Sequence, residues 1–391
     1  MSHPIQTVLL YHTDSHVVDR VFALCEDANL HVRILTAFSQ AEARDYLASN
    51  ACAVVVALCT PLADRHLARI FELHYPCPLI ALLDVDGDAK QMTAALRQGA
   101  SDIFVPDRLM SDEEGAAFIV CLKIYLDKAR LVDENQQYRE SLELSLAELK
   151  ADQKAALQIQ QRMLPPPAME LAADIRASYC LTPSLYLSGD FVDLVVLNKR
   201  FSMFYLADVS GHGASSALVT VLLKNMTNRL VRNFQRSSSF DILAPASTLM
   251  RVNQELLDTG LGKHLTMFIG LFDFENDTLR YAVGGHHPMP VLLTEQGASF
   301  LGGRGMPVGL FEEPFFEERE MALPERFSLT VFSDGILEML GSGSMAEKEA
   351  RLCEVVSQQA TTDPVRLRDA LATRAVTDAP DDIAVMILAR P

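Results

Sequence analysis

The chain has 391 residues, which is enough for two ordinary domains and a connector, each domain with its own core. Its 51 acidic and 34 basic residues give a formal net charge of −17. Because a nucleic-acid-binding surface needs a basic field, this charge argues against DNA or RNA as the main ligand. The longest apolar stretch, over residues 51–62, is shorter than the roughly 20 residues that span a bilayer, and no N-terminal signal pattern is visible. We therefore expect a cytoplasmic protein that does not enter a membrane.

Residues 5–125 alternate short apolar runs with helix-like segments. The pattern predicts strands over 8–11, 32–35, 53–58, 79–83 and 103–105, and helices over 17–27, 40–49, 89–98 and 112–127. Continuous apolar strands that alternate with helices favour a parallel, doubly wound α/β sheet. The pattern resembles a response-regulator receiver domain, which is flavodoxin-like in fold, and we assign residues 1–127 to it.

The chain departs from that family where the receiver chemistry belongs. Counting four residues back from the proline at position 61 puts Ala57 at the expected phosphoacceptor position. The expected hydroxyl residue falls on Leu83 and the expected lysine on Val105, and the tract after the first strand keeps one carboxylate, Asp14. A phosphoryl group needs a carboxylate nucleophile, a Mg²⁺ site and a neutralising cation. We therefore interpret residues 1–127 as a pseudo-receiver, a binding and dimerisation module that is not phosphorylated.

A shifted register is the alternative to this interpretation. Asp64 or Asp84 would then be the phosphoacceptor, and the chain would be an ordinary phosphorelay regulator. Asp64 lies beyond the loop that contains Pro61, and Asp84 belongs to a different predicted strand. Both positions fit the receiver pattern less well than Ala57 does.

Residues 128–164 form the predicted connector. The segment is rich in Gln, Glu, Leu, Ala and Lys and contains no glycine or proline, which predicts one long helix ending before the prolines at 165–167. Six residues fit a heptad seam that Ser145 and Asp152 interrupt: Tyr138, Leu142, Leu149, Ala156, Ile159 and Met163. The connector is either a coiled coil in a parallel homodimer or a helix packed on its own C-terminal domain.

Four aspartates in the C-terminal part stand in short phrases next to strand-like runs. They are Asp190 in SGDFVD, Asp208 in ADVSGHG, Asp334 in FSDGILE and Asp381 in DDIAVMIL. Carboxylates at the ends of several buried strands can converge on one point. Because Mg²⁺ and Mn²⁺ take oxygen ligands, these phrases predict a site for two such ions. The plainer alternative is that acidic turn residues cap strands and bind nothing.

The order of these phrases resembles the metal-dependent serine/threonine phosphatases related to protein phosphatase 2C (PP2C), in particular the bacterial SpoIIE/RsbU branch. The resemblance begins near residue 158 and includes IQQRMLPPP, GGHHP at 284–288 and GMPVG at 305–309. It implies an α/β/β/α sandwich over residues 165–391. It also implies hydrolysis by water that two Mn²⁺ or Mg²⁺ ions activate, with no protein nucleophile.

The resemblance also assigns a ligand set. Asp208 would bridge the two ions, with the carbonyl of Val209 as a further ligand. Asp334 and Asp381 would hold one ion, and Asp190 the other, directly or through water. Two more carboxylates are plausible outer groups that orient waters or ligands: Asp193 and Asp382.

Three histidines lie inside site-like phrases: His212, His286 and His287. A seryl oxygen is a poor leaving group that benefits from a general acid, and any of the three could serve. A turn whose histidines bond to the backbone is the more economical reading of GGHHP. We therefore assign no catalytic histidine.

By resemblance, the substrate is phosphoserine or phosphothreonine on a small anti-sigma-factor antagonist. The chain would then be a phosphatase that acts on a phosphorylated partner protein, under the control of its receiver-like domain. The alternative from another class is a catalytically silent adaptor that binds the phosphorylated partner without hydrolysis. Mn²⁺-dependent hydrolysis of a phosphate ester distinguishes the two.

Overall fold

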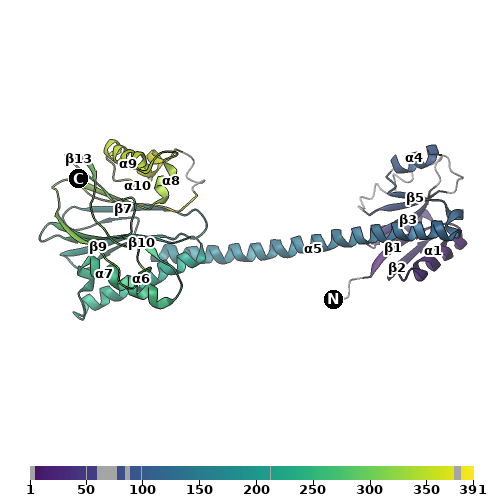
Figure 1. The fold of residues 1–391 in the computed structure, drawn as a ribbon, viewed down its shortest axis with the longest axis horizontal. Helices are drawn as coiled ribbons and strands as arrows, with labels where there is room; N and C mark the ends of the chain where they lie inside the picture. Colours follow the sequence, from purple (N-terminus) through teal and green to yellow (C-terminus); the bar gives the residue numbers. More distant parts are fainter. Residues whose placement is uncertain are drawn as a thin grey trace. The chain divides into compact units, whose positions relative to one another are not determined.

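The computed structural model describes residues 5–49, 51–59, 77–83, 89–97, 99–211, 213–373 and 380–391. The chain divides into two compact units, Met1–Leu146 and Ala147–Pro391. Helix α5 (Asp112–Met163) has 52 residues and contributes to both units (Figure 1). The helix that we expected over 112–127 and the helix that we expected in the connector, residues 128–164, are therefore a single helix, since no proline or capping signal separates them.

The N-terminal unit is built on a five-stranded parallel sheet with the order β2-β1-β3-β4-β5. This is the order of flavodoxin-like, doubly wound folds. Its strands lie within one or two residues of the predicted ones: β1 (Gln6–Tyr11), β2 (Val32–Ala37), β3 (Val54–Cys59), β4 (Leu79–Leu83) and β5 (Asp102–Phe104).

Helices cover both faces of this sheet, which is why its strands are apolar on both sides. Helix α1 (Ser15–Asp27), the short 3-10 helix η1 (Pro106–Met110) and the first turns of α5 pack on one face. Helices α2 (Gln40–Ser49) and α4 (Ala89–Arg97) pack on the other.

The positions expected to carry receiver chemistry are apolar and buried in the structure. Ala57 lies inside β3, Leu83 is the last residue of β4, and Val105 precedes η1. Asp14 caps α1 by accepting a hydrogen bond from the His16 backbone N–H. The two alternative acceptors, Asp64 and Asp84, lie outside the described residues.

The C-terminal unit contains two sheets whose described strand pairs are all antiparallel. The first has the order β14-β11-β10-β9-β8, formed by β8 (Asp190–Val196), β9 (Phe201–Val209), β10 (Leu265–Asp273), β11 (Thr278–Gly284) and β14 (Glu318–Ala322). The second has the order β13-β12-β15-β16-β7-β6, formed by β6 (Ala168–Glu170), β7 (Arg176–Thr182), β12 (Val291–Thr294), β13 (Gly297–Phe300), β15 (Phe327–Phe332) and β16 (Ile383–Arg390).

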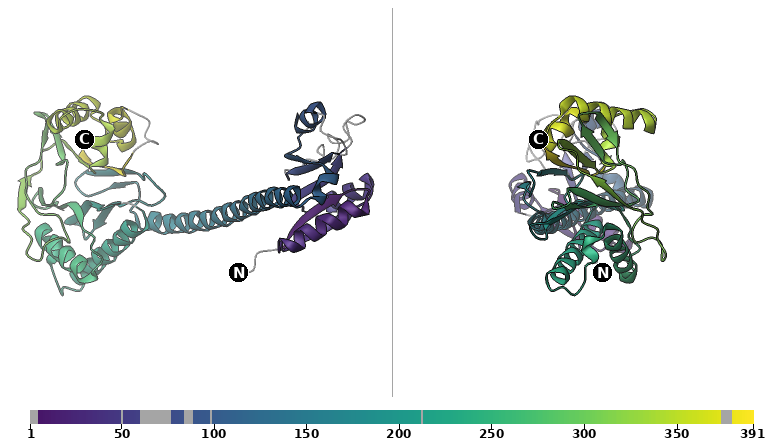
Figure 2. Two further views of the ribbon diagram at one scale, coloured as in Figure 1. Left: turned by 45° about the vertical axis from the view of Figure 1, so that its right-hand side comes forward. Right: turned by 90° about the vertical axis from the view of Figure 1, so that its left-hand side faces the viewer.

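Helices lie outside the two sheets, so the unit has four layers (Figures 1 and 2). Helices α6 (Ala214–Gln235) and α7 (Pro245–Thr259), with η2 (Asp241–Leu243) between them, pack on the first sheet. Helices α8 (Gly335–Met339), α9 (Met345–Gln359) and α10 (Pro364–Leu371) pack on the second. A third core of large side chains fills the space between the sheets.

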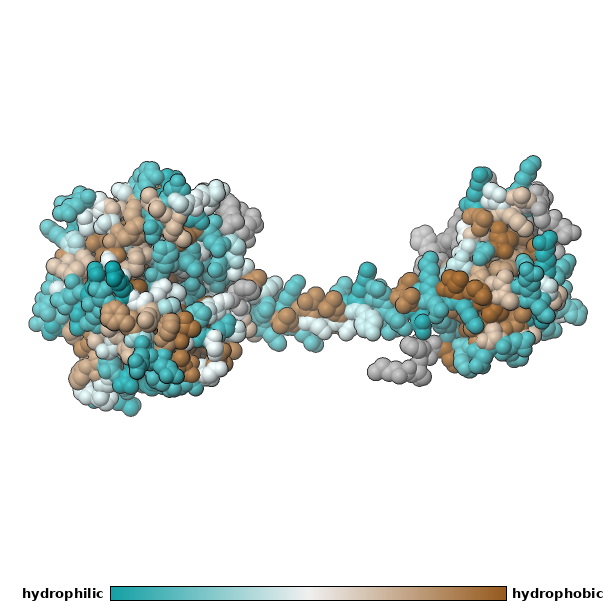
Figure 3. Space-filling view, in the orientation of Figure 1, coloured by the Kyte–Doolittle hydropathy of each residue, from teal (hydrophilic) through white to brown (hydrophobic). Residues whose placement is uncertain are grey.

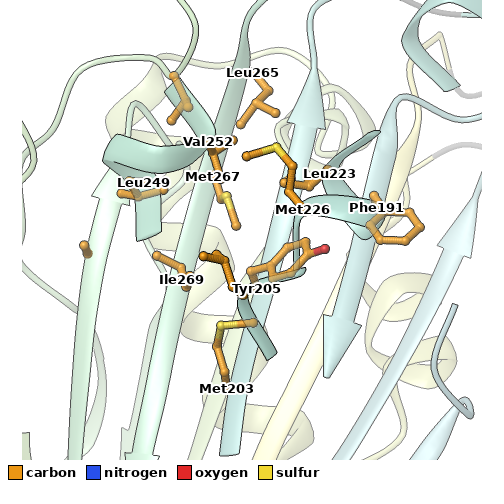
Figure 4. Packing of buried hydrophobic residues seen from close by; sticks show 14 of the residues in the cluster. Phe191, Met203, Tyr205, Leu223, Met226, Leu249, Val252, Leu265, Met267 and Ile269 are labelled. Carbon is orange, nitrogen blue, oxygen red and sulfur yellow. The ribbon is translucent and has the colours of Figure 1, made fainter. Parts of the chain in front are cut away.

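The alternation along β9 shows how one strand serves two cores. Met203 and Tyr205 point toward α6 and α7, where Figure 4 shows them with residues of both helices. Phe204 and Leu206 point into the core between the sheets. Because side chains alternate along a strand, the next even position, Asp208, also lies on the inter-sheet side.

Helix α5 exposes many apolar side chains between its two ends. Leu131, Tyr138, Leu142 and Leu149 are 60%, 76%, 61% and 53% exposed, and Figure 3 shows apolar residues among hydrophilic ones along this helix. At its C-terminal end, Met163 packs against the core under α6. Across the described residues we find no helix that combines the length and the apolar character of a membrane span.

Candidate metal centre

Two of the four aspartates face each other across neighbouring strands. Asp190 begins β8 and Asp208 lies near the end of β9, and the two residues are direct partners in the antiparallel register. Both occupy even-numbered positions of their strands, as do the side chains of β8 and β9 that fill the inter-sheet core. The two carboxylates therefore lie at one end of that core, and Asp190 is 1% exposed.

The second sheet delivers the other two aspartates to the same end. Asp334 follows β15 and Asp381 precedes β16, and these strands pair with each other. A Cβ added to Gly335 would lie 2.0 Å from the Asp382 carbonyl oxygen. Only glycine permits this close approach, which brings the two acidic phrases together.

A cavity of about 290 Å³ lies where these phrases meet. Asp208, Asp334 and Asp381 line it. So do Ser210, Gly211, His264, Thr266 and Pro380. The cavity joins residues of β9, β10 and the segments next to β15 and β16, which are far apart in the sequence.

The carboxylates disfavour each other's charge. Burial, followed by the Asp208 charge, raises the pKa of Asp190 well above its ordinary value. Burial, followed by the charges of Asp334 and Asp381, raises the pKa of Asp208 to about 7. Burial and Asp381 also raise the pKa of Asp334. A cluster of this kind is stable in its ionised form when cations offset the repulsion.

The donor set fits hard divalent cations. The Asp190 Oδ2 atom is buried and has no hydrogen-bond partner. This oxygen is therefore available as a ligand for a metal ion. Within the described parts of the chain, no three carboxylate, imidazole or thiol groups are close enough to form a cage around one ion. Mg²⁺ does not need such a cage, because it usually binds through one or two carboxylates and keeps several waters.

The backbone of Val209 lies close to the backbone of Gly189, the residue before Asp190. Its carbonyl oxygen would be 2.9 Å from a Cβ added to Gly189, the residue before Asp190. The Val209 N–H donates to the Gly189 carbonyl at 3.3 Å. The predicted carbonyl ligand therefore lies next to the segment that leads into Asp190.

Asp193 does not belong to this cluster, and our expectation for it was wrong. It is three residues after Asp190 on the same strand, so its side chain points to the opposite face, toward α6. Lys224 Nζ donates to its two carboxylate oxygens at 2.7 and 2.9 Å, and the Tyr205 hydroxyl donates at 3.3 Å. Asp193 is fully buried and forms an ion pair within the core.

Asp382 holds the loop before β8. Its Oδ1 accepts from the backbone N–H and the hydroxyl of Ser184, at 2.7 and 2.9 Å. Its Oδ2 accepts from the Gly189 N–H at 2.6 Å. A carboxylate with these partners orients the segment that carries Asp190, which is compatible with the outer role that we expected.

The histidines of the GGHHP phrase lie at different depths. His286 is buried, and its burial lowers its pKa to about 3, so it is neutral at physiological pH and has no proton to donate as an imidazolium. His287 is partly exposed and contacts the Met345 sulfur at 3.4 Å. The third candidate, His212, lies outside the described residues.

Three residues near the cavity were not predicted. His264 and Thr266 line it, because β10 pairs with β9 and places Thr266 opposite Asp208.

Gln160 is buried at the end of α5, where its Nε2 donates to the Ser188 carbonyl at 2.7 Å and to the Thr220 hydroxyl at 3.1 Å. The Ser188 hydroxyl in turn accepts from the Asp190 N–H. Gln160 lies outside the predicted heptad seam, and no local pattern in the sequence marks it.

Comparison with known proteins agrees with this architecture. Residues 199–391 match the family described as Stage II sporulation protein E (SpoIIE), a range that contains Asp208, Asp334 and Asp381 but not Asp190. The phosphoserine phosphatase RsbP of Bacillus subtilis is 24% identical over 198 residues, covering 49% of this chain and 47% of RsbP. Protein IcfG of Synechocystis sp. is 23% identical over 202 residues, covering 46% of this chain and 32% of IcfG. The chain thus spans about half or less of each of these relatives.

Among solved structures, the SiaA-PP2C domain of Pseudomonas aeruginosa has a similar fold. It superposes with a TM-score of 0.52 and 18% sequence identity, covering 63% of this chain and 98% of that domain. This similarity concerns the fold, and the sequence match concerns the C-terminal half. Residues 199–391 thus match the SpoIIE family, and the C-terminal unit has a PP2C-like fold.

Proposed function

We propose that the chain is a Mn²⁺- or Mg²⁺-dependent phosphatase that hydrolyses phosphoserine or phosphothreonine on a partner protein. The observation that carries this proposal is the convergence of carboxylates from both sheets on one cavity, with the buried Asp190 Oδ2 lacking a partner. The relative RsbP is a phosphoserine phosphatase, which supports the same reaction class. An anti-sigma-factor antagonist is the proposed partner protein.

In this proposal the metal ligands come from both sheets. Asp208, Val209 and Asp190 from the first sheet, with Asp334 and Asp381 from the second, would hold two cations. Two divalent cations supply Lewis acidity, lower the pKa of a water and offset the charge of a phosphate ester. The protein contributes the position of each carboxylate, a cavity large enough for a phosphoryl group and its waters, and an acidic field that retains the cations.

Two neighbouring residues keep this arrangement rigid. Asp382 fixes the Gly189 N–H, so that Asp190 enters β8 with its side chain turned inward. Ser333 accepts a hydrogen bond from the Ala384 N–H and so ties the ends of β15 and β16 together. Rigid strands hold a site more accurately than loops do.

We further propose that the N-terminal unit is a pseudo-receiver that does not accept a phosphoryl group. Its strand order and the buried, apolar Ala57, Leu83 and Val105 support this view. Its role would be to dimerise the chain and to control the phosphatase domain through α5. Gln160 supports such control, because it connects α5 to the loop before Asp190.

The exposed heptad residues of α5 support a parallel homodimer. Leu131 and Tyr138 are seven residues apart, as are Leu142 and Leu149, and all four are exposed. These two sets fall on alternate core positions of a heptad repeat. In a parallel dimer, Asn135 would then lie at a core position, where a polar residue fixes register and the number of helices.

The test is the hydrolysis of p-nitrophenyl phosphate and of a phosphoseryl peptide by the full-length chain, with and without Mn²⁺ or Mg²⁺. We expect turnover with either ion and none with EDTA. The matched control is Asp174→Asn, an exposed carboxylate of the same unit, which should leave turnover unchanged. Binding of the phosphoseryl peptide without turnover would instead identify a silent adaptor.

A further inference from the structure

A lysine ammonium group lies at the edge of the acidic cavity. Lys263 precedes His264, which lines the cavity, and its Nζ donates to the Ser210 carbonyl at 2.8 Å and to the Ser216 hydroxyl at 3.3 Å. A Cβ added to Gly211, another lining residue, would be 3.2 Å from this Nζ. The positive charge therefore lies directly beside the cavity wall.

The Lys263 ammonium group differs from that of Lys224, a lysine of α6. Lys224 is neutralised by Asp193, with both carboxylate oxygens within 2.9 Å. Among the described residues, the acceptors recorded for Lys263 are a carbonyl and a hydroxyl, which are uncharged. An ammonium group has three donors, and these two hydrogen bonds use two of them, so Lys263 has one donor left for an anion.

The chain holds Lys263 in place on both sides. Gly260 and Gly262 have φ values of 63°, in the left-handed region that favours glycine, and they turn the chain from α7 into β10. The Ser210 N–H donates to the His264 carbonyl at 2.9 Å, and Leu265 exchanges two backbone hydrogen bonds with Val308. The backbone of Lys263 is thus anchored beside the loop that follows Asp208.

A phosphate monoester dianion needs a donor of this kind here. The carboxylates of the cavity repel it, and two cations can contact only part of its oxygens. Lysine binds phosphate as a point charge. We propose that Lys263 binds a non-bridging oxygen of the substrate phosphate, and of the orthophosphate product, and so positions the phosphoryl group over the carboxylate cluster. This inference rests on the proposed phosphatase function, because it concerns the same cavity.

The experiment measures orthophosphate binding by the full-length, Mg²⁺-loaded chain with isothermal titration calorimetry. Lys263→Met should weaken orthophosphate binding about 10-fold or more, since a hydrogen bond to a charged group contributes about 1.5–3 kcal/mol. Lys263→Arg keeps the charge and should retain part of the affinity. The control Lys199→Met removes an exposed lysine from the β8–β9 turn, at the other end of those strands, and should change nothing.

Two further readouts separate binding from a structural role. Mg²⁺ affinity and the thermal midpoint should stay at wild-type values in Lys263→Met, whereas the KM for a phosphoseryl peptide should rise. If the variant lowers Mg²⁺ affinity or stability but keeps wild-type orthophosphate affinity, Lys263 only braces Ser210 and the inference is wrong. Absence of orthophosphate binding by the wild-type chain would also overturn it.

The outcomes also distinguish this inference from the proposed function. A wild-type chain that hydrolyses phosphoserine, with an unaffected Lys263→Met variant, contradicts the inference alone. A chain that hydrolyses nothing but loses orthophosphate affinity in Lys263→Met contradicts the phosphatase function and keeps the phosphate site.

Discussion

Replacing Asp208 by asparagine should make the metal-free chain more stable at pH 8, although it removes a residue of the proposed active site. The pKa of Asp208 is raised from 3.8 to about 7 by burial and by the neighbouring carboxylates. The folded state therefore binds this proton more tightly than the unfolded state. The stability that this proton provides is fully present below pH 3.8 and is lost as the pH rises through about 7.

The magnitude follows from the two pKa values. At 1.36 kcal/mol per pKa unit, the ionised carboxylate lowers the free energy of unfolding by at most about 4 kcal/mol above pH 7. Asp208 is partly exposed and shares its repulsion with other groups, so we expect a gain of about 2 kcal/mol in Asp208→Asn. For a unit of this size, that gain raises the midpoint by about 4–8 °C.

The assay is thermal unfolding of the full-length chain with EDTA at pH 5 and pH 8, and with Mn²⁺ at pH 8. The transition that Mn²⁺ shifts belongs to the C-terminal unit. Without metal, the variant should exceed wild type by more at pH 8 than at pH 5, because the unfolded chain loses this proton above pH 3.8 and only part of the effect is present at pH 5. With Mn²⁺ at about 100 times its dissociation constant, wild type should gain about 2.7 kcal/mol and the variant little.

The control is Asp174→Asn, which removes one exposed negative charge at a positive-φ position that asparagine also tolerates. A gain of the same size in this variant would mean that net charge, and not the cluster, sets stability. The reasoning is refuted if metal-free Asp208→Asn is no more stable than wild type at pH 8, or if its advantage at pH 5 is as large as at pH 8.

Three further predictions concern separate parts of the chain. Asp334→Asn should retain less than about a tenth of wild-type turnover, because even outer groups of metal sites contribute 10–100-fold; higher activity in the phosphate ester assay would count against its role. Lys224→Met should destabilise the C-terminal unit by about 3 kcal/mol in urea unfolding, since it leaves the buried Asp193 charge unpaired. The double variant Lys224→Met, Asp193→Asn should recover part of this loss of stability, and no recovery would contradict the explanation. Leu142→Lys should weaken the dimer of the full-length chain in sedimentation velocity, because it places a charge in the proposed seam. A wild-type monomer would refute the dimer.

The strands and the placement of most acidic phrases could be predicted from the sequence. Apolar runs before Asp208 and Asp334, and after Asp381, identify buried strands, and residues at the ends of such strands can meet. The N-terminal sheet was equally accessible, because its strands are continuous apolar runs separated by helices. The predicted elements there differ from the observed ones by only one or two residues at most ends.

Other features depend on details that a motif does not contain. Asp193 was grouped with Asp190 because both belong to SGDFVD, yet an odd separation on one strand places them on opposite faces. Lys263 and His264 reach the cavity through the long-range pairing of β10 with β9, which no local pattern specifies. The contact of Gln160 with Ser188 joins segments 28 residues apart and depends on where α5 packs.

The central claim is that the carboxylate cluster holds two divalent cations, and Mn²⁺ binding tests it most directly. Titration calorimetry of the metal-free, full-length chain should give two Mn²⁺ ions per chain. Asp208→Asn should lose measurable binding at one or both of these sites, and Asp174→Asn should bind as wild type does. Absence of Mn²⁺ binding by the wild-type chain, or unchanged binding by Asp208→Asn, would contradict the account.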